Sequence, residues 1–120
     1  MRRGTRRWGL LLAAVLSAAL GLGVVHAGAA EQAPYRLRVD AVAYHLPGRT
    51  ASGLQVRNGV VAVDPALIPL GTRLFVPGYG QAVAADVGVA IKGRIIDLWM
   101  PSRAEARKWG RKTVVITVYG

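Results

Sequence analysis

The sequence of 120 residues contains no cysteine, and this absence excludes several classes of protein. Without cysteine there is no disulfide framework, no thiol nucleophile and no cysteine for lipid attachment. Histidine is almost as scarce: after His26 near the N-terminus only His45 remains, too few for a histidine-based metal site. We therefore predict no metal site and no cofactor, a structural or surface role for His45, and a fold that depends on its hydrophobic core alone.

Acidic residues are also rare: the sequence has six of them and 16 lysines and arginines, so its formal net charge is +10. Three of the six have ordinary positions, in a linker, on a half-exposed strand and in a helix cap; these are Glu31, Asp40 and Glu105. The other three each end or interrupt an apolar run; these are Asp64, Asp86 and Asp97.

The N-terminus has the layout of an export signal. Four arginines between residues 2 and 7 precede an uncharged apolar run over residues 10–25, and small residues follow near residue 27. The run is short for a membrane span, so we predict a signal peptide over residues 1–27, with an uncleaved N-terminal anchor as the alternative. Residues 28–35 are predicted to be a linker and residues 36–120 a single domain.

Removal of the leader leaves twelve basic and six acidic residues, a formal charge of +6. A basic exported domain is attracted to polyanions, which a bacterial wall or an anionic membrane surface supplies. Export argues against nucleic acid as the partner. We expect a secreted, wall-associated protein that contacts the membrane only through its N-terminal segment, if that segment is not cleaved.

Short β-type runs separated by glycine and proline dominate the rest of the chain. They cover residues 36–44, 59–63, 73–76, 81–85, 94–100 and 113–119. Pro77 and Gly78 predict a type II turn that pairs the third and fourth runs. Between the last two runs, Ser102 and Glu105 form a capping box and Gly110 is a stop signal, which predicts one helix. About six strands in roughly ninety residues favour a small closed barrel, because closure removes exposed edges.

Asp97 is the most unusual of the three aspartates. It lies within Ile95-Ile96-Asp97-Leu98-Trp99, where an ionised carboxylate is costly unless it is hydrogen-bonded or its pKa rises. Asp86 ends an apolar run ahead of Gly88, and Asp64 precedes Pro65, so for both a turn role competes with a functional one.

The order of short motifs resembles the 3D domain family, named for three aspartates. The matching segments are Val61-Ala62-Val63-Asp64-Pro65, Ile68-Pro69-Leu70-Gly71-Thr72, Val76-Pro77-Gly78-Tyr79-Gly80, Ala85-Asp86-Val87-Gly88, Ala90-Ile91-Lys92-Gly93-Arg94 and Ile96-Asp97-Leu98. Upstream, Thr50-Ala51-Ser52-Gly53 resembles a further family motif, with Ser52 where the family has threonine. The resemblance runs in order through residues 38–119.

The resemblance implies a mainly all-β fold, a six-stranded double-psi β-barrel with one short helix, similar to the catalytic domain of membrane-bound lytic transglycosylase A. The implied reaction cleaves the β-1,4 bond between N-acetylmuramic acid and N-acetylglucosamine in peptidoglycan and forms a 1,6-anhydro sugar. Because the sugar's own C6 hydroxyl replaces water, one carboxyl group can act as both general acid and general base.

By the same resemblance Asp97 is the general acid/base, Asp86 positions and tunes it, and Asp64 supports the barrel loops. The expected sugar-binding residues are Tyr44, Thr50, Ser52, Gly53, Lys92 and Gly93. Solvated loop roles for Thr50, Ser52 and Lys92 remain the alternative. Tyr79, Trp99 and Trp109 are further candidates to stack on sugar rings, although core packing is the expected role of both tryptophans.

The sequence departs from the family after the second aspartate. The family has Asp-Thr-Gly-Gly, whereas this chain has Asp86-Val87-Gly88-Val89. Loss of a hydroxyl and a glycine there puts turnover in question more than fold. A non-catalytic glycan-binding barrel is therefore the alternative to an enzyme, and an exported module that binds a wall protein is a third hypothesis.

Overall fold

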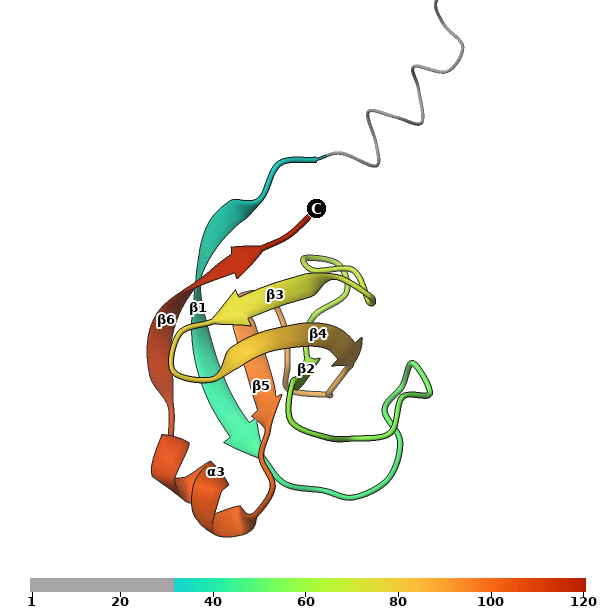
Figure 1. Cartoon of the computed structure of the whole chain (residues 1–120), viewed down its shortest axis with the longest axis vertical. Helices are drawn as coiled ribbons and strands as arrows, with labels where there is room; N and C mark the ends of the chain where they lie inside the picture. Colours follow the sequence, from blue (N-terminus) through green and yellow to red (C-terminus); the bar gives the residue numbers. More distant parts are fainter. Residues whose placement is uncertain (1–31) are drawn as a thin grey trace, which may run out of the picture. The chain divides into compact units, whose positions relative to one another are not determined.

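Six strands and one helix follow each other in the computed structural model, which describes residues 32–120 (Figure 1). The elements are β1 (Tyr35–Tyr44), β2 (Val60–Ala62), β3 (Arg73–Val76), β4 (Gly80–Asp86), β5 (Ile95–Trp99), α3 (Arg103–Trp109) and β6 (Lys112–Val118). The signal peptide predicted over residues 1–27 lies outside the described residues. Within residues 32–120, no helix is long and apolar enough to span a membrane.

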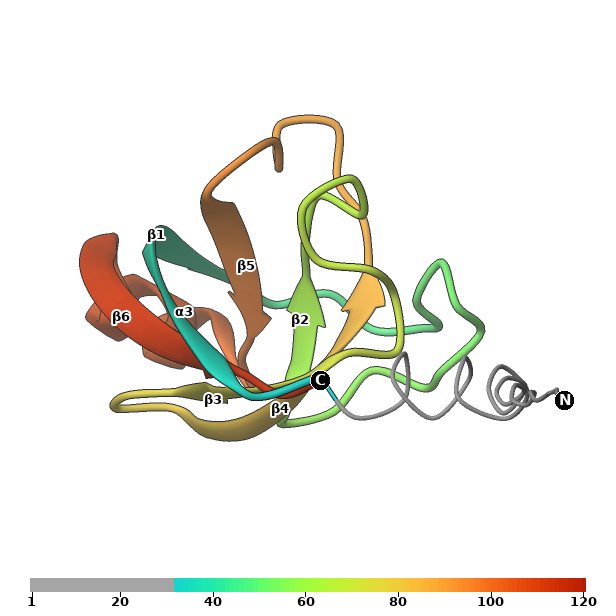
Figure 2. The same ribbon diagram turned by 90° about the horizontal axis from the view of Figure 1, so that it is seen from above.

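The strands close into a barrel in the order β1-β5-β2-β4-β3-β6 (Figures 1 and 2). Two pairings are parallel, β1 with β5 and β2 with β4, and the other four are antiparallel. Parallel neighbours need crossover connections, so the chain passes repeatedly from one side of the barrel to another. The predicted six-stranded, mainly β double-psi barrel with one short helix is confirmed.

The barrel interior contains small and branched apolar side chains from alternate strand positions. On β1, Leu37, Val39 and Ala41 are buried in the core, whereas Arg36 and Arg38 are exposed. Each of the other five strands and the segments that follow β2 and β5 also contribute to the core; these residues are Val61, Val63, Ile68, Leu74, Val76, Ala82, Ala84, Ile96, Leu98, Met100, Ile116 and Val118. The alternation thus fixes which residues of each strand face outward.

The turn and the helix form where local sequence signals predicted them. Gly78 has a φ of 82°, and the amide of Tyr79 bonds the carbonyl of Val76 at 3.0 Å, which joins β3 and β4 in an antiparallel pair. Ser102 caps α3 by accepting a hydrogen bond from the Glu105 amide at 3.1 Å. Gly110, with a φ of 69°, ends the helix.

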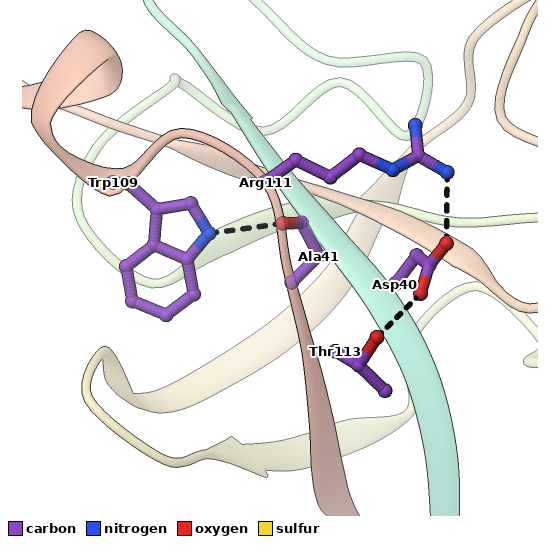
Figure 3. A network of polar contacts seen from close by, with 5 residues as sticks. All are labelled: Asp40, Ala41, Trp109, Arg111 and Thr113. Carbon is purple, nitrogen blue, oxygen red and sulfur yellow. Dashed lines mark hydrogen bonds and ion pairs between the residues drawn. The ribbon is translucent and has the colours of Figure 1, made fainter.

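Side-chain bonds fix the end of α3 and the start of β6 to β1 (Figure 3). The Trp109 indole N–H donates to the Ala41 carbonyl at 3.0 Å, and Asp40 accepts hydrogen bonds from Arg111 at 2.8 Å and Thr113 at 3.0 Å. These bonds hold α3 against the barrel although none of its residues is fully buried.

Candidate functional site

Asp97 lies in the middle of β5 and faces away from the barrel core. Its neighbours Ile96 and Leu98 are buried in the core, and alternation along the strand places Asp97 on the outer face. There it pairs across the sheet with Val42 of β1 and Ala62 of β2. The two apolar neighbours in sequence therefore do not surround the carboxyl group, which is half-buried on the barrel surface.

Asp86, the last residue of β4, is placed close to Asp97 by the strand order. The residue opposite Asp86 is Ala62, and Ala62 is also the residue opposite Asp97, so the two aspartates lie on either side of one alanine. Two strand spacings of about 4.8 Å separate their backbones. The register shift between Val61 and Ala62 brings Asp86 into this alignment.

The environment of Asp97 favours its protonated form. Burial raises the pKa of Asp97 to about 6, and the nearby charge of Asp86 adds to this rise. The Oδ1 atom of Asp97 is buried and has no hydrogen-bond partner among residues 32–120. An acid with this pKa can donate a proton near neutral pH and accept it back, which is what a general acid/base requires.

Tyr44 adds a hydroxyl group to the same place. Its hydroxyl lies 3.4 Å from Oδ2 of Asp86, to which it donates. Burial, the charges of Asp86 and Asp97 and the hydrogen bond to Asp86 all raise the pKa of Tyr44, so the phenol stays protonated at physiological pH. The tyrosine predicted from the sequence is thus brought to the aspartate pair.

Backbone amides hold the other oxygen of Asp86. Its Oδ1 accepts hydrogen bonds from the amides of Ala51 and Val87, both at 2.9 Å. The amide of Ser52 also bonds the Ala85 carbonyl at 3.2 Å. The loop around residue 51 is therefore attached to the end of β4 next to the site.

Within that loop the predicted sugar-binding residues bond largely to one another. Thr50 is only 6% exposed, and its hydroxyl contacts the Ser52 hydroxyl at 3.0 Å and accepts from the Leu54 amide at 3.0 Å. Gly53 has a φ of 88°, and its carbonyl accepts a hydrogen bond from Arg49 at 2.9 Å. Ser52 remains exposed beside Asp86.

Asp64 serves a neighbouring loop. Its Oδ1 accepts from the Ala66 amide at 3.0 Å and its Oδ2 from the Gly93 amide at 2.8 Å. These backbone hydrogen bonds lower the pKa of Asp64, with Lys92 nearby adding to the effect. The structure therefore places Gly93 against Asp64 and leaves Lys92 exposed, and no hydrogen bond within residues 32–120 joins either of them to Asp86 or Asp97.

The loop after Asp86 carries the two valines that depart from the family motif. Val87 is partly exposed, and Val89 is 96% exposed. Gly88 between them has no room for a side chain, since a Cβ atom there would lie 2.9 Å from Cγ1 of Ile91. The loop thus presents apolar groups to solvent beside the aspartate pair.

Two contacts at the site were missed by the sequence reasoning. Ala62, between the aspartates, and Ala51, which donates its amide to Asp86, act through position and backbone, so their residue types carry no signal. The hydroxyl of Tyr79, a residue considered for sugar stacking, accepts from the Gly59 amide and donates to the Trp99 carbonyl, both at 2.8 Å.

His45 and Trp99 attach the start of the long loop after β1 to the end of β5. The His45 Nδ1 atom lies 2.7 Å from the Met100 carbonyl oxygen, and the Trp99 indole N–H donates to the Leu46 carbonyl at 2.7 Å. Among residues 32–120, no group of three or more histidine, cysteine, aspartate or glutamate side chains is placed to hold a metal ion.

Comparison with known proteins gives relatives from Bacillus subtilis strain 168. The protein named cell wall-binding protein YocH is 44% identical over 97 residues, covering 73% of this chain and 34% of YocH. The putative cell wall shaping protein YabE is 49% identical over 75 residues, covering 59% of this chain and 18% of YabE. The chain thus spans about a third or less of these relatives.

Among solved structures, the lytic transglycosylase MltA of Escherichia coli has the same barrel. One MltA structure aligns with a TM-score of 0.52 and 27% identity, and the structure with bound chitohexaose with 0.53 and 26%. Both alignments cover 62% of this chain and 28% of MltA. The profile of the family described as the 3D domain matches residues 59–119, from the start of β2 to the end of β6. This match covers just over half of the 120 residues and includes all three aspartates, so the chain belongs to the 3D domain family.

Proposed function

We propose that this protein is a secreted enzyme of lytic transglycosylase type that acts on peptidoglycan, with Asp97 as its general acid/base. The observation that carries the proposal is the half-buried Asp97 carboxyl beside a second aspartate, with a pKa raised to about 6 and an oxygen that has no partner among residues 32–120. Perturbed carboxyl groups of this kind are concentrated at catalytic sites. The names of YocH and YabE and the fold of MltA support the bacterial wall as the location and peptidoglycan as the substrate.

The proposed reaction is balanced without water. Protonated Asp97 donates its proton to the glycosidic oxygen as the bond from that oxygen to C1 of the N-acetylmuramic residue breaks. The C6 hydroxyl of the same residue then forms a bond to C1 and gives its proton to the Asp97 carboxylate. The products are a 1,6-anhydro sugar and a free hydroxyl on the leaving chain, and Asp97 regains its proton.

In this mechanism Asp86 increases the fraction of Asp97 that is protonated before the reaction begins. Its charge raises the pKa of Asp97, and the bonds from Tyr44, Ala51 and Val87 fix its position. The Tyr44 hydroxyl oxygen can also accept a hydrogen bond from a sugar hydroxyl. Ser52 and Lys92 are exposed and are proposed to contact the sugar, whereas Thr50, Gly53, Gly93 and Asp64 shape the loops.

The test is mass spectrometry of the soluble fragments that the purified protein releases from sacculi. We expect anhydromuropeptides from the parent protein and none from Asp97→Asn. Asp40→Asn is the matched control: it removes an aspartate that bonds Arg111, just before β6, and Thr113 on β6, so it should release the same products as the parent. Release by Asp97→Asn at the parent's rate would refute the assigned role.

A non-catalytic glycan-binding barrel is the second candidate, and the exposed Val87 and Val89 favour it together with the name of YocH. It predicts that the protein sediments with sacculi but releases no fragments. If neither sedimentation nor release is seen, the third hypothesis, a module that binds a wall protein, replaces both. Detection of the protein in the culture medium or wall fraction, rather than in the cytoplasm, tests export separately.

A further inference from the structure

A hollow lies at the end of the barrel, between α3 and the β3–β4 turn. Its volume is about 570 Å³, within the range of small-ligand sites. Its lining includes none of the three aspartates and none of Tyr44, Thr50, Ser52, Gly53, Lys92 and Gly93, although it does include Tyr79 and Trp109, two of the candidates for stacking on sugar rings. We call it the α3 groove; its side chains come from Asn58, Tyr79, Gln81, Glu105, Lys108, Trp109 and Lys112, with Met100 and Pro101 between them.

The aromatic part of the α3 groove is rigidly held. The Trp109 indole is fixed by its bond to the Ala41 carbonyl (Figure 3) and lies edge-on to Tyr79 at a centroid distance of 6.5 Å. Gly78 rests on the same ring, since a Cβ atom at that position would lie 3.4 Å from it. The hydroxyl of Tyr79 is already used by Gly59 and Trp99, so its ring is what remains for a ligand.

The rim of the α3 groove combines charges of both signs with amide groups. Lys112 places its ammonium 4.0 Å from the centre of the Trp109 ring, and Lys108 lies on the exposed side of α3. Within residues 32–120 the one ion pair joins Arg111 to Asp40, so Lys108, Lys112 and Glu105 are free to pair with a ligand. Five of the basic residues fall within residues 103–112, which makes this end of the domain positive.

From this arrangement we propose that the α3 groove binds a short acidic peptide, and, resting on the proposed function, that this is the peptide carried by the glycan strand. Lys108 and Lys112 can form ion pairs with carboxylates, and Glu105 can form one with a side-chain amine. The side-chain amides of Asn58 and Gln81 can donate hydrogen bonds to peptide groups and accept them. A phosphodiester polymer would need cations alone, and Glu105 would repel it.

The position of the groove is compatible with this assignment. Met100, in its lining, follows Asp97 by three residues, which corresponds to about 10 Å along an extended strand. A peptide of three or more residues spans that distance. Occupancy of the groove would therefore favour peptide-bearing glycans over bare ones.

The experiment is an NMR titration of the purified protein with a synthetic stem tetrapeptide that has free carboxylates. The Trp109 indole N–H signal should shift on binding. Lys108→Gln should weaken binding about three- to fivefold, the size of an exposed ion pair. Arg103→Gln is the matched control, because it removes one positive charge from the same helix outside the groove lining and should leave binding unchanged.

Three results would overturn the proposal. The first is an equal loss of peptide affinity in the Lys108→Gln and Arg103→Gln variants. The second is binding of the fully amidated peptide as tightly as the peptide with free carboxylates. The third is tighter binding of poly(glycerol phosphate) than of the peptide, detected by shifts of the same NMR signals. Sacculus digestion keeps the two proposals apart. If fragments are released but the peptide does not bind, the peptide-binding proposal is wrong and the catalytic proposal stands. If the peptide binds but no fragments are released, the catalytic proposal is wrong and the peptide-binding proposal stands.

Discussion

Replacement of Asp97 by asparagine should stabilise the fold at neutral pH while removing the proposed activity. The ionised carboxylate is held in a half-buried place beside Asp86, with one oxygen unpartnered among residues 32–120. Its pKa rises from 3.8 to about 6, which corresponds to at most ~3 kcal/mol. Because the side chain keeps partial contact with solvent, screening reduces this to about 1–2 kcal/mol.

The sign of this effect follows from proton linkage. Above pH 6 the carboxylate is ionised in the folded and unfolded states, and the folded state bears the full cost of the charge. Below pH 3.8 the group is neutral in both states and the cost is absent, so stability is lost as the pH rises through about 6. The gain from Asp97→Asn should therefore be present at pH 7.5 and vanish at pH 3.5.

Urea unfolding followed by tryptophan fluorescence at these two pH values measures the difference in free energy. In a domain of this size each kcal/mol also moves the melting temperature by about 4–8 °C. Asp40→Asn is the control with the opposite sign, because its hydrogen bonds from Arg111 and Thr113 lower the pKa of Asp40 and stabilise the ionised form. If Asp97→Asn is less stable than the parent at pH 7.5, or its gain is the same at both pH values, the assignment of a buried charge penalty is wrong.

Three further predictions concern the loops and caps. Tyr79→Phe leaves the Gly59 amide and the Trp99 carbonyl without their shared hydrogen-bond partner. The free energy of unfolding in urea should therefore fall by about 1–3 kcal/mol, whereas a fall below about 0.5 kcal/mol would mean that water replaces the hydroxyl. Ser102→Ala removes the cap of α3 and should cost about 1 kcal/mol in the same assay, whereas Ser102→Asp should retain most of it. The double change Val87→Thr and Val89→Gly restores the family motif, and it should raise fragment release from sacculi if the valines limit turnover; no gain would remove them as the cause.

Local signals in the sequence were sufficient for the helix and one hairpin. The cap at Ser102, the stop at Gly110 and the turn at Pro77 and Gly78 act within a few residues, and the structure has each of them in the predicted place. Alternation also indicated that Asp97 interrupts an apolar strand. It did not show that the core lies on the side of Ile96 and Leu98, because Ile95 and Trp99 on the side of Asp97 are apolar as well.

The non-local pairings could not be derived from periodicity. Which strands are parallel neighbours decides that Ala62 lies between Asp86 and Asp97, and nothing in the residues of β2 encodes this. The bond from the Ala51 amide to Asp86 depends on how a loop docks across 35 residues of sequence. Thr50, expected at the sugar, bonds its own loop, because a buried hydroxyl takes the nearest partners available.

The antiparallel pairing of β1 with β6 brings Tyr35 opposite Val118, so the two ends of the barrel domain leave from one edge. Tyr44, beside the aspartate pair, lies at the other end of β1, about 30 Å away along a strand of ten residues. Another protein can therefore be joined to both ends of the domain at one place that lies far from the aspartate pair. We therefore expect that the barrel can be inserted into a surface loop of another protein, or circularly permuted through a short linker between its ends. In both cases the face with the aspartate pair should stay accessible to the substrate.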